Sequence, residues 1–380
     1  MRASRILVVD DDPGMLRAVE RVLGVSHHVI GTTSPRDALL KAAAVNPDLA
    51  IIDIRMPELD GFELMTRLKS QFAELDIILM TGSIDDLDEK LVRALRSPAF
   101  YFIQKPFDRD VLRTLVQRCL ELRWRREQHR RNVERLEAEM TEAHAFQQSL
   151  LPGRDAVING LAICCRYAPC ARLGGDLYDY AAVESGKTAL LVADVSGHGV
   201  SAAMLTGVVK SAFHASRADG FEPSAVVDRV WHALTPFSAQ RFVTLFIALV
   251  APAERRLTYA SAGHPSIPVW SGLRDPVWLE STGPLISPVL PASCDVRTTS
   301  VDEGDQLLLY TDGVSETLAG DGCAKSRILT SIEENAAGGA QLLDAIVDAV
   351  GRALEGRAQP DDLTLLTARV LGRGQTGAVH

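Results

Sequence analysis

The chain has 380 residues, which exceeds the usual size of one domain, so its length predicts two domains with a connecting segment. Hydrophobic residues make up 47% and charged residues 23% of the sequence, proportions typical of folded globular proteins, which argues against extensive disorder. A formal net charge of −9 argues against direct nucleic-acid binding, because neutralising phosphates requires a basic face.

Membrane insertion and secretion are also disfavoured. The sequence contains no run of about 18 apolar residues, and Met1-Arg2 leads directly into a strand pattern without a signal-peptide core. The six cysteines form no CxxC pair and do not recur at zinc-ligand spacing. Reduced thiols and a cytoplasmic location are therefore expected.

The first third of the sequence alternates short apolar runs with helical periodicity. The runs at 6–9, 49–52, 77–80 and 100–103 predict strands, and Pro13 to Leu23 predicts a helix capped by Asp12. This alternation predicts an α/β fold with a doubly wound, five-stranded parallel sheet. Because ligands bind beyond the carboxyl ends of such strands, the residues after each run are site candidates. They are Asp10, Asp11, Asp53, Thr81 and Lys105.

These five residues form a chemically consistent set. Three carboxylates at adjoining strand ends would repel one another unless a cation lay among them, and hard oxygen ligands select Mg²⁺. A hydroxyl and an ammonium group suit the oxygens of a phosphoryl group. A helix-capping role explains any single Asp here, but it does not explain all five residues together.

Through these residues, the segment from about 4 to 120 resembles the receiver domain of response regulators. The matching stretches are VVDDD at 8–12, DIRMPELDG at 53–61, MTG at 80–82 and KPF at 105–107. The resemblance implies that Asp53 accepts a phosphoryl group from a histidine kinase or phosphotransfer protein. It also implies that Mg²⁺ is bound by Asp10, Asp11, Asp53 and the backbone carbonyl of Arg55. Thr81 and Lys105 would sense phosphorylation, with Phe102 at the switch position.

Apolar residues then recur at steps of three and four from Leu112 to Leu150, with Arg126, His129 and Gln147 at polar positions of the same seam. This heptad spacing predicts a helical coiled-coil linker at 121–150 and a homodimer formed through residues 112–150. The alternative is a long helix that lies on the chain's own domains. The arginine-rich stretch in this segment is interleaved with glutamates, which is typical of a solvated helix face.

After Pro152-Gly153 the sequence changes to strand-like runs with glycine-rich turns. Acidic residues stand beside glycines or each other in GGDLYD at 174–179, DVSGHG at 194–199, TDG at 311–313 and DD at 361–362. Clustered carboxylates without basic partners predict hard divalent cations. Two cations that share a carboxylate can activate water and hold a phosphoryl group for in-line attack. The loop histidines His198 and His264 are more simply explained as structural.

Residues 145–370 resemble the metal-dependent protein phosphatases (PPM, protein phosphatase 2C-like), in their sporulation and stress-response branch. The resemblance rests on the four acidic segments and on AFQQSLLP at 145–152, FVTLFIALV at 242–250 and LTYASAGHP at 257–265. It implies an α+β domain over 151–372, built as a β-sandwich flanked by helices, with two Mn²⁺ or Mg²⁺ ions.

The same resemblance implies a ligand set. Asp194 would bridge both ions, Asp176 and the backbone carbonyl of Val195 would bind one ion, and Asp312 and Asp361 the other. Asp179 is a further candidate, acting through water. Hydrolysis would proceed without a covalent enzyme intermediate. Residues 373–380 are expected to form a disordered tail.

The leading hypothesis is a two-component response regulator in which phosphorylation of Asp53 controls a metal-dependent serine/threonine protein phosphatase. By resemblance, the substrate is a phosphoserine on an anti-sigma-factor antagonist in a sigma-factor partner-switching pathway. The alternative is a non-catalytic adaptor that binds a sigma factor or its regulator. The presence of Asp176, Asp194, Asp312 and Asp361 favours the enzyme. A DNA-binding regulator is disfavoured because no helix-turn-helix candidate follows the receiver segment.

Overall fold

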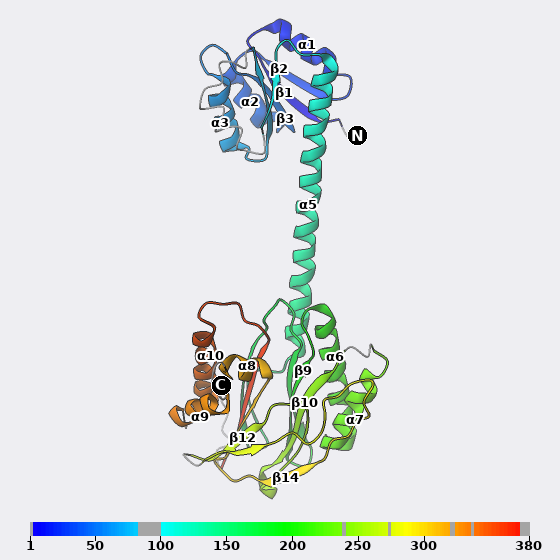
Figure 1. Ribbon diagram of the computed structural model, residues 1–380, viewed down its shortest axis with the longest axis vertical. Helices are drawn as coiled ribbons and strands as arrows, with labels where there is room; N and C mark the ends of the chain where they lie inside the picture. The colour runs from blue at the N-terminus through cyan, green and yellow to red at the C-terminus, as the bar shows by residue number, and fades with distance from the viewer. Residues whose placement is uncertain are drawn as a thin grey trace. The chain divides into compact units, whose positions relative to one another are not determined.

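A computed structural model of the protein describes residues 3–82, 100–237, 241–272, 275–319, 324–335 and 338–372. The chain divides into two compact units, Met1–Leu136 and Glu137–His380 (Figure 1). Within the described ranges, no helix combines the length and the apolar character needed to cross a membrane. The tail predicted at 373–380 lies outside the described residues.

The first unit contains the predicted doubly wound sheet. Its parallel strands lie in the order β2-β1-β3-β4-β5. Their bounds are Arg5–Val9 (β1), His28–Thr32 (β2), Leu49–Asp53 (β3), Asp76–Thr81 (β4) and Phe100–Gln104 (β5). The apolar runs located four of these strands. They missed β2, because His28, Gly31 and Thr32 interrupt its apolar pattern.

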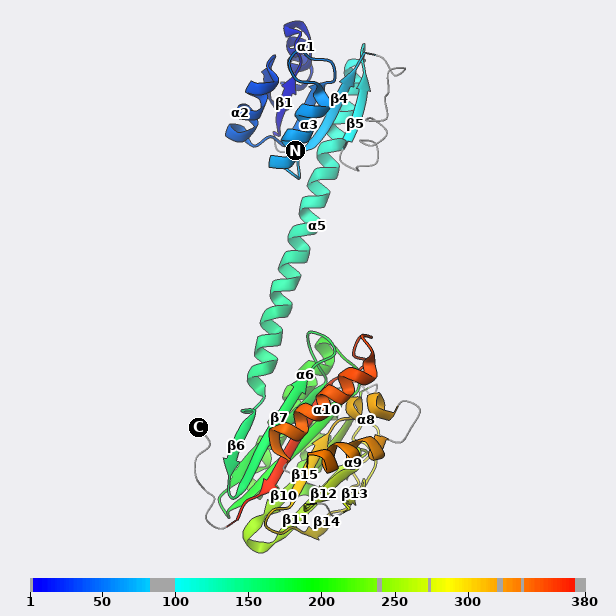
Figure 2. The ribbon, with the colours of Figure 1, turned by 90° about the vertical axis from the view of Figure 1, so that its left-hand side faces the viewer.

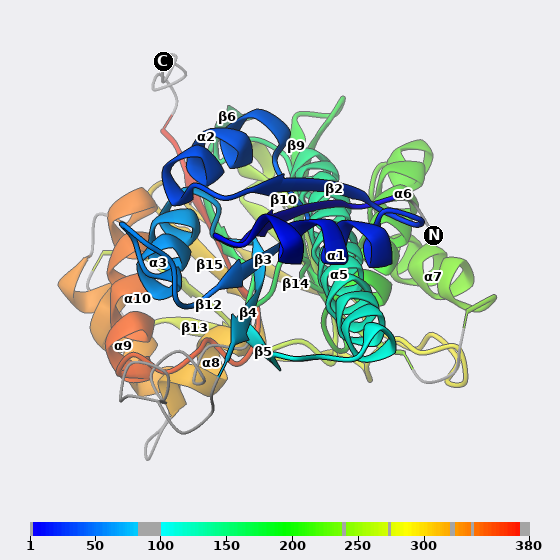
Figure 3. The same cartoon turned by 90° about the horizontal axis from the view of Figure 1, so that it is seen from above.

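Helices cover both faces of this sheet. They are α1 (Pro13–Leu23), α2 (Pro35–Val45), α3 (Gly61–Gln71) and α5 (Arg109–Leu150). Because side chains alternate along a strand, Leu7 and Val9 of β1 pack with α2 and α3, whereas Ile6 and Val8 pack with α1 and α5 (Figure 3). Burial on both faces explains why the strands read as continuous apolar runs.

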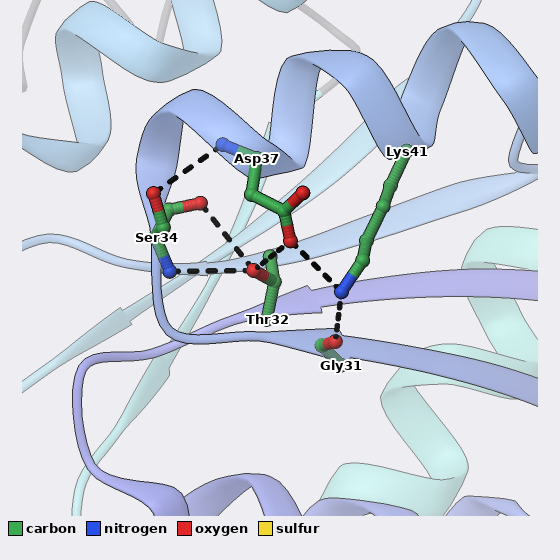
Figure 4. A network of polar contacts seen from close by, with 5 residues as sticks. All are labelled: Gly31, Thr32, Ser34, Asp37 and Lys41. Atoms are coloured by element: carbon green, nitrogen blue, oxygen red, sulfur yellow. Dashed lines mark hydrogen bonds and ion pairs between the residues drawn. The ribbon is translucent and has the colours of Figure 1, made fainter.

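Local capping fixes two of these helices. The side chain of Asp12 accepts a hydrogen bond from the Gly14 amide at 2.7 Å and Pro13 opens α1, as predicted. At α2, the Ser34 hydroxyl accepts from the Asp37 amide at 3.3 Å. Figure 4 shows that Asp37 also accepts from Thr32, at 2.8 Å, and pairs with Lys41, at 2.9 Å. These contacts join the end of β2 to the start of α2.

The structure corrects the extent of the predicted coiled-coil surface. Leu112, Val116 and Cys119 of α5 are fully buried against the five-stranded parallel sheet. Further along α5, Arg126 binds the buried carboxylate of Asp76, with its Nη2 atom 2.8 and 2.7 Å from the two oxygens. These positions are occupied within the chain, so they are not available to a second helix. Apolar seam residues that remain exposed begin at Leu122 and include Val133 and Leu136.

Replacing Arg126 with methionine is expected to lower the free energy of unfolding by about 1–3 kcal/mol. The variant would leave the Asp76 carboxylate buried without its charged donor, and hydrogen bonds to charged groups are typically worth this amount. Chemical denaturation of the full chain measures the effect. Arg125→Met, at the exposed neighbouring position, is the matched control and should change stability little. Equal stability of the two variants would contradict a structural role for the Arg126–Asp76 contact.

The second unit contains two antiparallel sheets. The five-stranded sheet has the order β14-β11-β10-β9-β8, and the six-stranded sheet has the order β13-β12-β15-β16-β7-β6. The strands of the first are β8 (Asp176–Val183), β9 (Lys187–Val195), β10 (Val243–Ala251), β11 (Arg256–Ala262) and β14 (Arg297–Ser300). Those of the second are β6 (Asp155–Ile158), β7 (Leu161–Ala168), β12 (Ile267–Trp270), β13 (Val277–Leu279), β15 (Gln306–Tyr310) and β16 (Leu363–Val370).

Helices flank the two sheets on their outer sides (Figure 2). They are α6 (Val200–Ala215), α7 (Pro223–Leu234), α8 (Asp312–Ala319), α9 (Ala324–Glu334) and α10 (Gly339–Leu354). Leu177 of β8 and Leu245 of β10 pack with α6 and α7 in one core. Tyr178 and Phe246, on the opposite faces of these strands, belong to the core that also contains β15, β16 and α8 to α10. The predicted β-sandwich flanked by helices is thereby confirmed.

Candidate phosphoryl-acceptor and divalent-cation sites

Strand order brings the predicted acidic residues of the first unit together. β1 and β3 are neighbours, so Asp10, directly after β1, lies beside Asp53 at the end of β3. Asp10, Asp11 and Asp53 each offer a carboxylate oxygen, and these oxygens lie within 4.8 Å of one another. Asp10 and Asp53 are buried, whereas Asp11 is exposed. The cluster therefore opens to solvent on the side of Asp11.

Lys105 connects two of these carboxylates. Its Nζ atom lies 2.7 Å from Asp10 Oδ2 and 2.7 Å from Asp53 Oδ1. Burial by itself would lower the pKa of Lys105, but its hydrogen bonds to the two carboxylates raise it overall. Burial raises the pKa of Asp53 and outweighs the opposing effect of Lys105. Three carboxylates face one ammonium group here, so the residues present fit a divalent cation.

The other predicted residues lie at the same edge of the sheet. Thr81 ends β4, and its carbonyl accepts a hydrogen bond from the Lys105 amide at 2.7 Å. Arg55 lies in the loop between Asp53 and α3. Gly61 allows the start of α3 to lie close to the backbone of Asp53, because a Cβ atom at this position would lie 2.2 Å from the Asp53 carbonyl oxygen. Phe102 lies on β5, half-buried, beside the core formed with α2 and α3.

A second acidic group lies in the other unit, at one edge of the five-stranded sheet. Asp176, the first residue of β8, pairs with Asp194 of β9, so their side chains lie on the same face. That face is the one that contains Tyr178 and Val192, toward the six-stranded sheet. Asp312 directly follows Thr311 at the end of β15, and Asp361 precedes β16. Asp312 and Asp361 thus come from the six-stranded sheet, and their charges act on Asp194 of the five-stranded sheet.

Asp194 lies at the centre of this group electrostatically. Burial, followed by the charges of Asp312, Asp361 and Asp362, raises the pKa of Asp194 to about 7. Burial and the charge of Asp361 also raise the pKa of Asp312. Burial is the largest cause of this raised pKa, and the next three causes are all neighbouring carboxylates. This concentration of negative charge fits divalent cations.

Two threonines, missed by the sequence analysis, hold Asp176. The fully buried carboxylate accepts hydrogen bonds from Thr311 Oγ1 at 2.7 Å and from Thr364 Oγ1 at 2.6 Å. Burial and the charge of Asp194 nevertheless raise the pKa of Asp176. Thr311 directly follows the apolar run of β15, and Thr364 lies among the leucines at the start of β16. A threonine at such a position is the sequence feature that could have indicated this role.

Asp362 shapes the backbone around the acidic group. Its Oδ1 atom accepts from the Cys170 amide at 2.7 Å and its Oδ2 atom from the Gly175 amide at 2.5 Å. A Cβ atom at Gly174 would lie 2.6 Å from Asp362 Oδ2, and one at Gly175 would lie 2.4 Å from the Val195 carbonyl oxygen. The two glycines are therefore required for the approach of Asp362 and of the Val195 carbonyl.

Gln147, expected at the coiled-coil seam, instead contacts this backbone. Its Nε2 atom donates to the Gly174 carbonyl at 2.7 Å, and its Oε1 atom accepts from the Gly174 amide at 3.1 Å. The Gln147 side chain is buried. The last turn of α5 is consequently bonded to the residue that lies two positions before Asp176.

Asp179, the further candidate that would act through water, has other partners in the structure. Asp179 lies three residues after Asp176 on β8, and an odd separation places it on the opposite face of the strand. Its carboxylate contacts Lys210 and lies 2.9 Å from His214 Nε2, both on α6. Asp179 therefore joins β8 to α6, on the face of β8 opposite Asp176.

Without divalent cations, Asp194 is expected to make the protein lose stability as pH rises from about 4 to about 7. The folded state keeps a proton on Asp194 up to a pKa of about 7, whereas the unfolded state releases it near 3.8. Between these values the folded state binds more protons, so the free energy of unfolding falls with rising pH. Thermal unfolding in a chelator measures this slope. Asp194→Asn should flatten the slope, and an equally steep slope in that variant would contradict the assignment.

Comparisons with known proteins agree with this division of the chain. Residues 6–117 match the model of the response regulator receiver domain, and residues 184–371 match that of stage II sporulation protein E (SpoIIE). Regulatory protein AtoC of Escherichia coli is 38% identical over 122 residues, which cover 31% of this chain and 26% of AtoC. Phosphoserine phosphatase RsbP of Bacillus subtilis is 31% identical over 161 residues, which cover 40% of this chain and 39% of RsbP.

A solved structure extends the likeness of the second unit. The SiaA-PP2C domain of Pseudomonas aeruginosa superposes with a TM-score of 0.53 at 22% identity, over 63% of this chain and 98% of that domain. At this identity the likeness shows the fold. The matches to AtoC and RsbP span between about a quarter and two fifths of those relatives.

Proposed function

We propose that this chain, which joins a response regulator receiver domain to a SpoIIE/PPM-type phosphatase domain, is a metal-dependent serine/threonine protein phosphatase controlled by phosphorylation of Asp53. The observation that carries the phosphatase activity is the convergence of Asp176, Asp194, Asp312 and Asp361 from two sheets, with the pKa of Asp194 raised to about 7. Neighbouring buried carboxylates repel one another, and a bound cation would relieve that repulsion.

The proposed ligand roles are those that the resemblance to the metal-dependent protein phosphatases implies. Asp194 would bridge two Mn²⁺ or Mg²⁺ ions, Asp176 and the Val195 carbonyl would serve one ion, and Asp312 and Asp361 the other. Thr311 and Thr364 hold the Asp176 carboxylate, and Asp362 holds the turn that carries it. When bound, the cations would activate water and withdraw charge from the phosphoryl oxygens.

In the receiver domain, the proposed acceptor is a carboxylate oxygen of Asp53. It would attack the phosphorus of a phosphohistidine on a histidine kinase or phosphotransfer protein, the phosphorus–nitrogen bond would break, and an acyl phosphate would form. Asp10, Asp11 and the Arg55 carbonyl would hold Mg²⁺ with Asp53. Thr81 and Lys105 would contact the transferred phosphoryl oxygens, and Lys105 already contacts Asp53 at 2.7 Å.

The proposed substrate is a phosphoserine on an anti-sigma-factor antagonist. RsbP is a phosphoserine phosphatase by name, and its similarity to part of this chain supports phosphoserine as the substrate class. The exposed seam residues Leu122, Val133 and Leu136 support a homodimer through the middle of α5. We also propose that the receiver domain ends at about residue 120 and that the phosphatase domain begins at about residue 151. Residues 121–150 of α5 would connect them.

Control of the phosphatase is proposed to pass through α5. One end of this helix packs on the receiver sheet through Leu112 and Val116. Its other end holds Gly174 through Gln147, next to the acidic group. A change in the position of α5 would therefore act on the backbone that carries Asp176.

The test is hydrolysis of p-nitrophenyl phosphate and of a phosphoserine protein by the full chain, with Mn²⁺, with Mg²⁺ and with a chelator. Hydrolysis that requires a divalent cation supports the phosphatase. A folded protein that hydrolyses neither compound with either ion would favour the adaptor, which binds a sigma factor or its regulator without catalysis.

A further inference from the structure

A partly exposed threonine lies next to Asp194 in the phosphatase sheet. Thr244 of β10 is the register partner of Asp194 on β9, which in turn pairs with Asp176 on β8. Directly opposed residues of antiparallel strands share a face, with Cβ atoms about 4.5–5.5 Å apart. The three side chains therefore form a row of two carboxylates and one hydroxyl across the same edge of the sheet.

The burial pattern shows that two members of this row, Thr244 and Asp194, are partly exposed, whereas Asp176 is buried. Of the nine residues of β10, Thr244 is the one that is not buried. Asp194 is likewise partly exposed between the buried residues Ala193 and Val195. An interior strand position that is open to solvent beside a carboxylate is accessible to a cation. The Thr244 side chain lies on the face of β10 that also carries Phe246, toward the six-stranded sheet.

A buried histidine holds the hydroxyl in place. His264 Nδ1 lies 3.0 Å from Thr244 Oγ1. His264 is 3% exposed. Burial lowers the pKa of His264 to about 3, so the ring is neutral near pH 7. In either neutral tautomer, one hydrogen bond to His264 leaves at least one lone pair of the hydroxyl free.

We propose that Thr244, oriented by His264, is an additional oxygen ligand of the divalent-cation site centred on Asp194. The inference rests on the proposed phosphatase function and adds a neutral donor to its acidic ligand set. Hydroxyl oxygens are hard donors that suit Mg²⁺ and Mn²⁺. His264 is a positioning residue, because it acts through its contact with Thr244. This assignment also gives the histidine of the ASAGHP segment a role that its loop position did not reveal.

The test measures Mn²⁺ binding to the full chain by calorimetry, without any substrate. All proteins carry Asp11→Asn, which removes an exposed carboxylate of the receiver cluster, so that the phosphatase site dominates the signal. Thr244→Val keeps the branched shape without the hydroxyl, and Thr244→Ser keeps the hydroxyl. Loss of a group that tunes a metal site typically costs about 10-fold to 100-fold in affinity. We expect about this loss for Thr244→Val and near-parental affinity for Thr244→Ser.

A second pair of variants tests the histidine. An asparagine amide can replace Nδ1, whereas a glutamine amide reaches the position of Nε2. His264→Asn should therefore keep Mn²⁺ affinity close to that of the parent, and His264→Gln should weaken it as Thr244→Val does. Parental affinity in Thr244→Val would overturn the inference and leave the phosphatase proposal intact. A parent protein that binds no Mn²⁺ would overturn both.

Discussion

Replacing Asp194 with asparagine is expected to reduce Mn²⁺-dependent hydrolysis of a phosphomonoester by about a thousandfold, which corresponds to roughly 4 kcal/mol of transition-state stabilisation. Asp194 is the residue on which the charges of Asp312, Asp361 and Asp362 act together. Removing its charge would deprive both proposed cations of a shared ligand. Steady-state rates measured over a range of Mn²⁺ concentrations separate weaker cation binding from slower hydrolysis at saturation.

The matched control for this variant is Asp344→Asn. Asp344 is an exposed carboxylate on α10 of the same domain. It pairs with Arg166 of β7, at a distance of 2.7 Å. Its replacement should leave the rate near that of the wild-type protein. A folded Asp194→Asn protein with the wild-type rate would show that the acidic group is not the catalytic centre. The chelator experiment on the same variant would then identify what the group does for stability.

Replacing Asp53 with asparagine is expected to abolish phosphorylation of the receiver domain by acetyl phosphate and to remove the effect of beryllofluoride on the phosphatase rate. Asparagine has no carboxylate oxygen to attack phosphorus, and it also removes one charged partner of Lys105. Phosphorylation is measured by intact-protein mass, and control of the phosphatase by the ratio of rates with and without beryllofluoride. The ratio should be one in the variant and should differ from one in the wild-type protein.

Asp48→Asn provides a control near the opposite end of β3. Asp48 precedes the first residue of β3, whereas Asp53 is its last residue. The Asp48 carboxylate accepts a hydrogen bond from the Arg5 amide at 2.8 Å. This variant should still be phosphorylated and should still respond. If beryllofluoride left both the hydrolysis rate and the oligomeric state of the wild-type protein unchanged, the proposed coupling through α5 and Gln147 would be wrong, whereas the phosphatase activity would stand.

Much of the fold was predictable because it depends on local patterns. Continuous apolar runs marked strands buried on both faces, and Asp12-Pro13 marked the start of α1. The weaker signals failed for physical reasons. β2 carries polar and glycine residues, so its apolar run is broken. Heptad spacing on α5 could not reveal which positions were already occupied, because the same apolar residues that suit a partner helix also suit the receiver sheet.

The candidate sites divide in the same way. Asp10, Asp53 and Lys105 follow strand ends of one parallel sheet, so sheet order alone places them together. Asp176 and Asp179 both belong to the GGDLYD segment, and the segment does not reveal which face each residue takes. Thr311, Thr364, Asp362 and Gln147 contact the acidic group or its backbone from distant segments. Those contacts require the pairing of two sheets and a helix end.

The sequence by itself determined that the chain holds two folded domains with a connector, and it determined the residue types of both sites. Length, the rhythm of apolar residues and glycines beside carboxylates are local properties, so they can be recognised before folding is known. The tertiary structure decided which of the acids share a face, which polar groups hold them and what the connector contacts. These facts depend on strand register and helix packing, which join residues far apart in the chain. Arg126 and Gln147, two of the polar seam residues, illustrate this difference, since each is bound within its own unit.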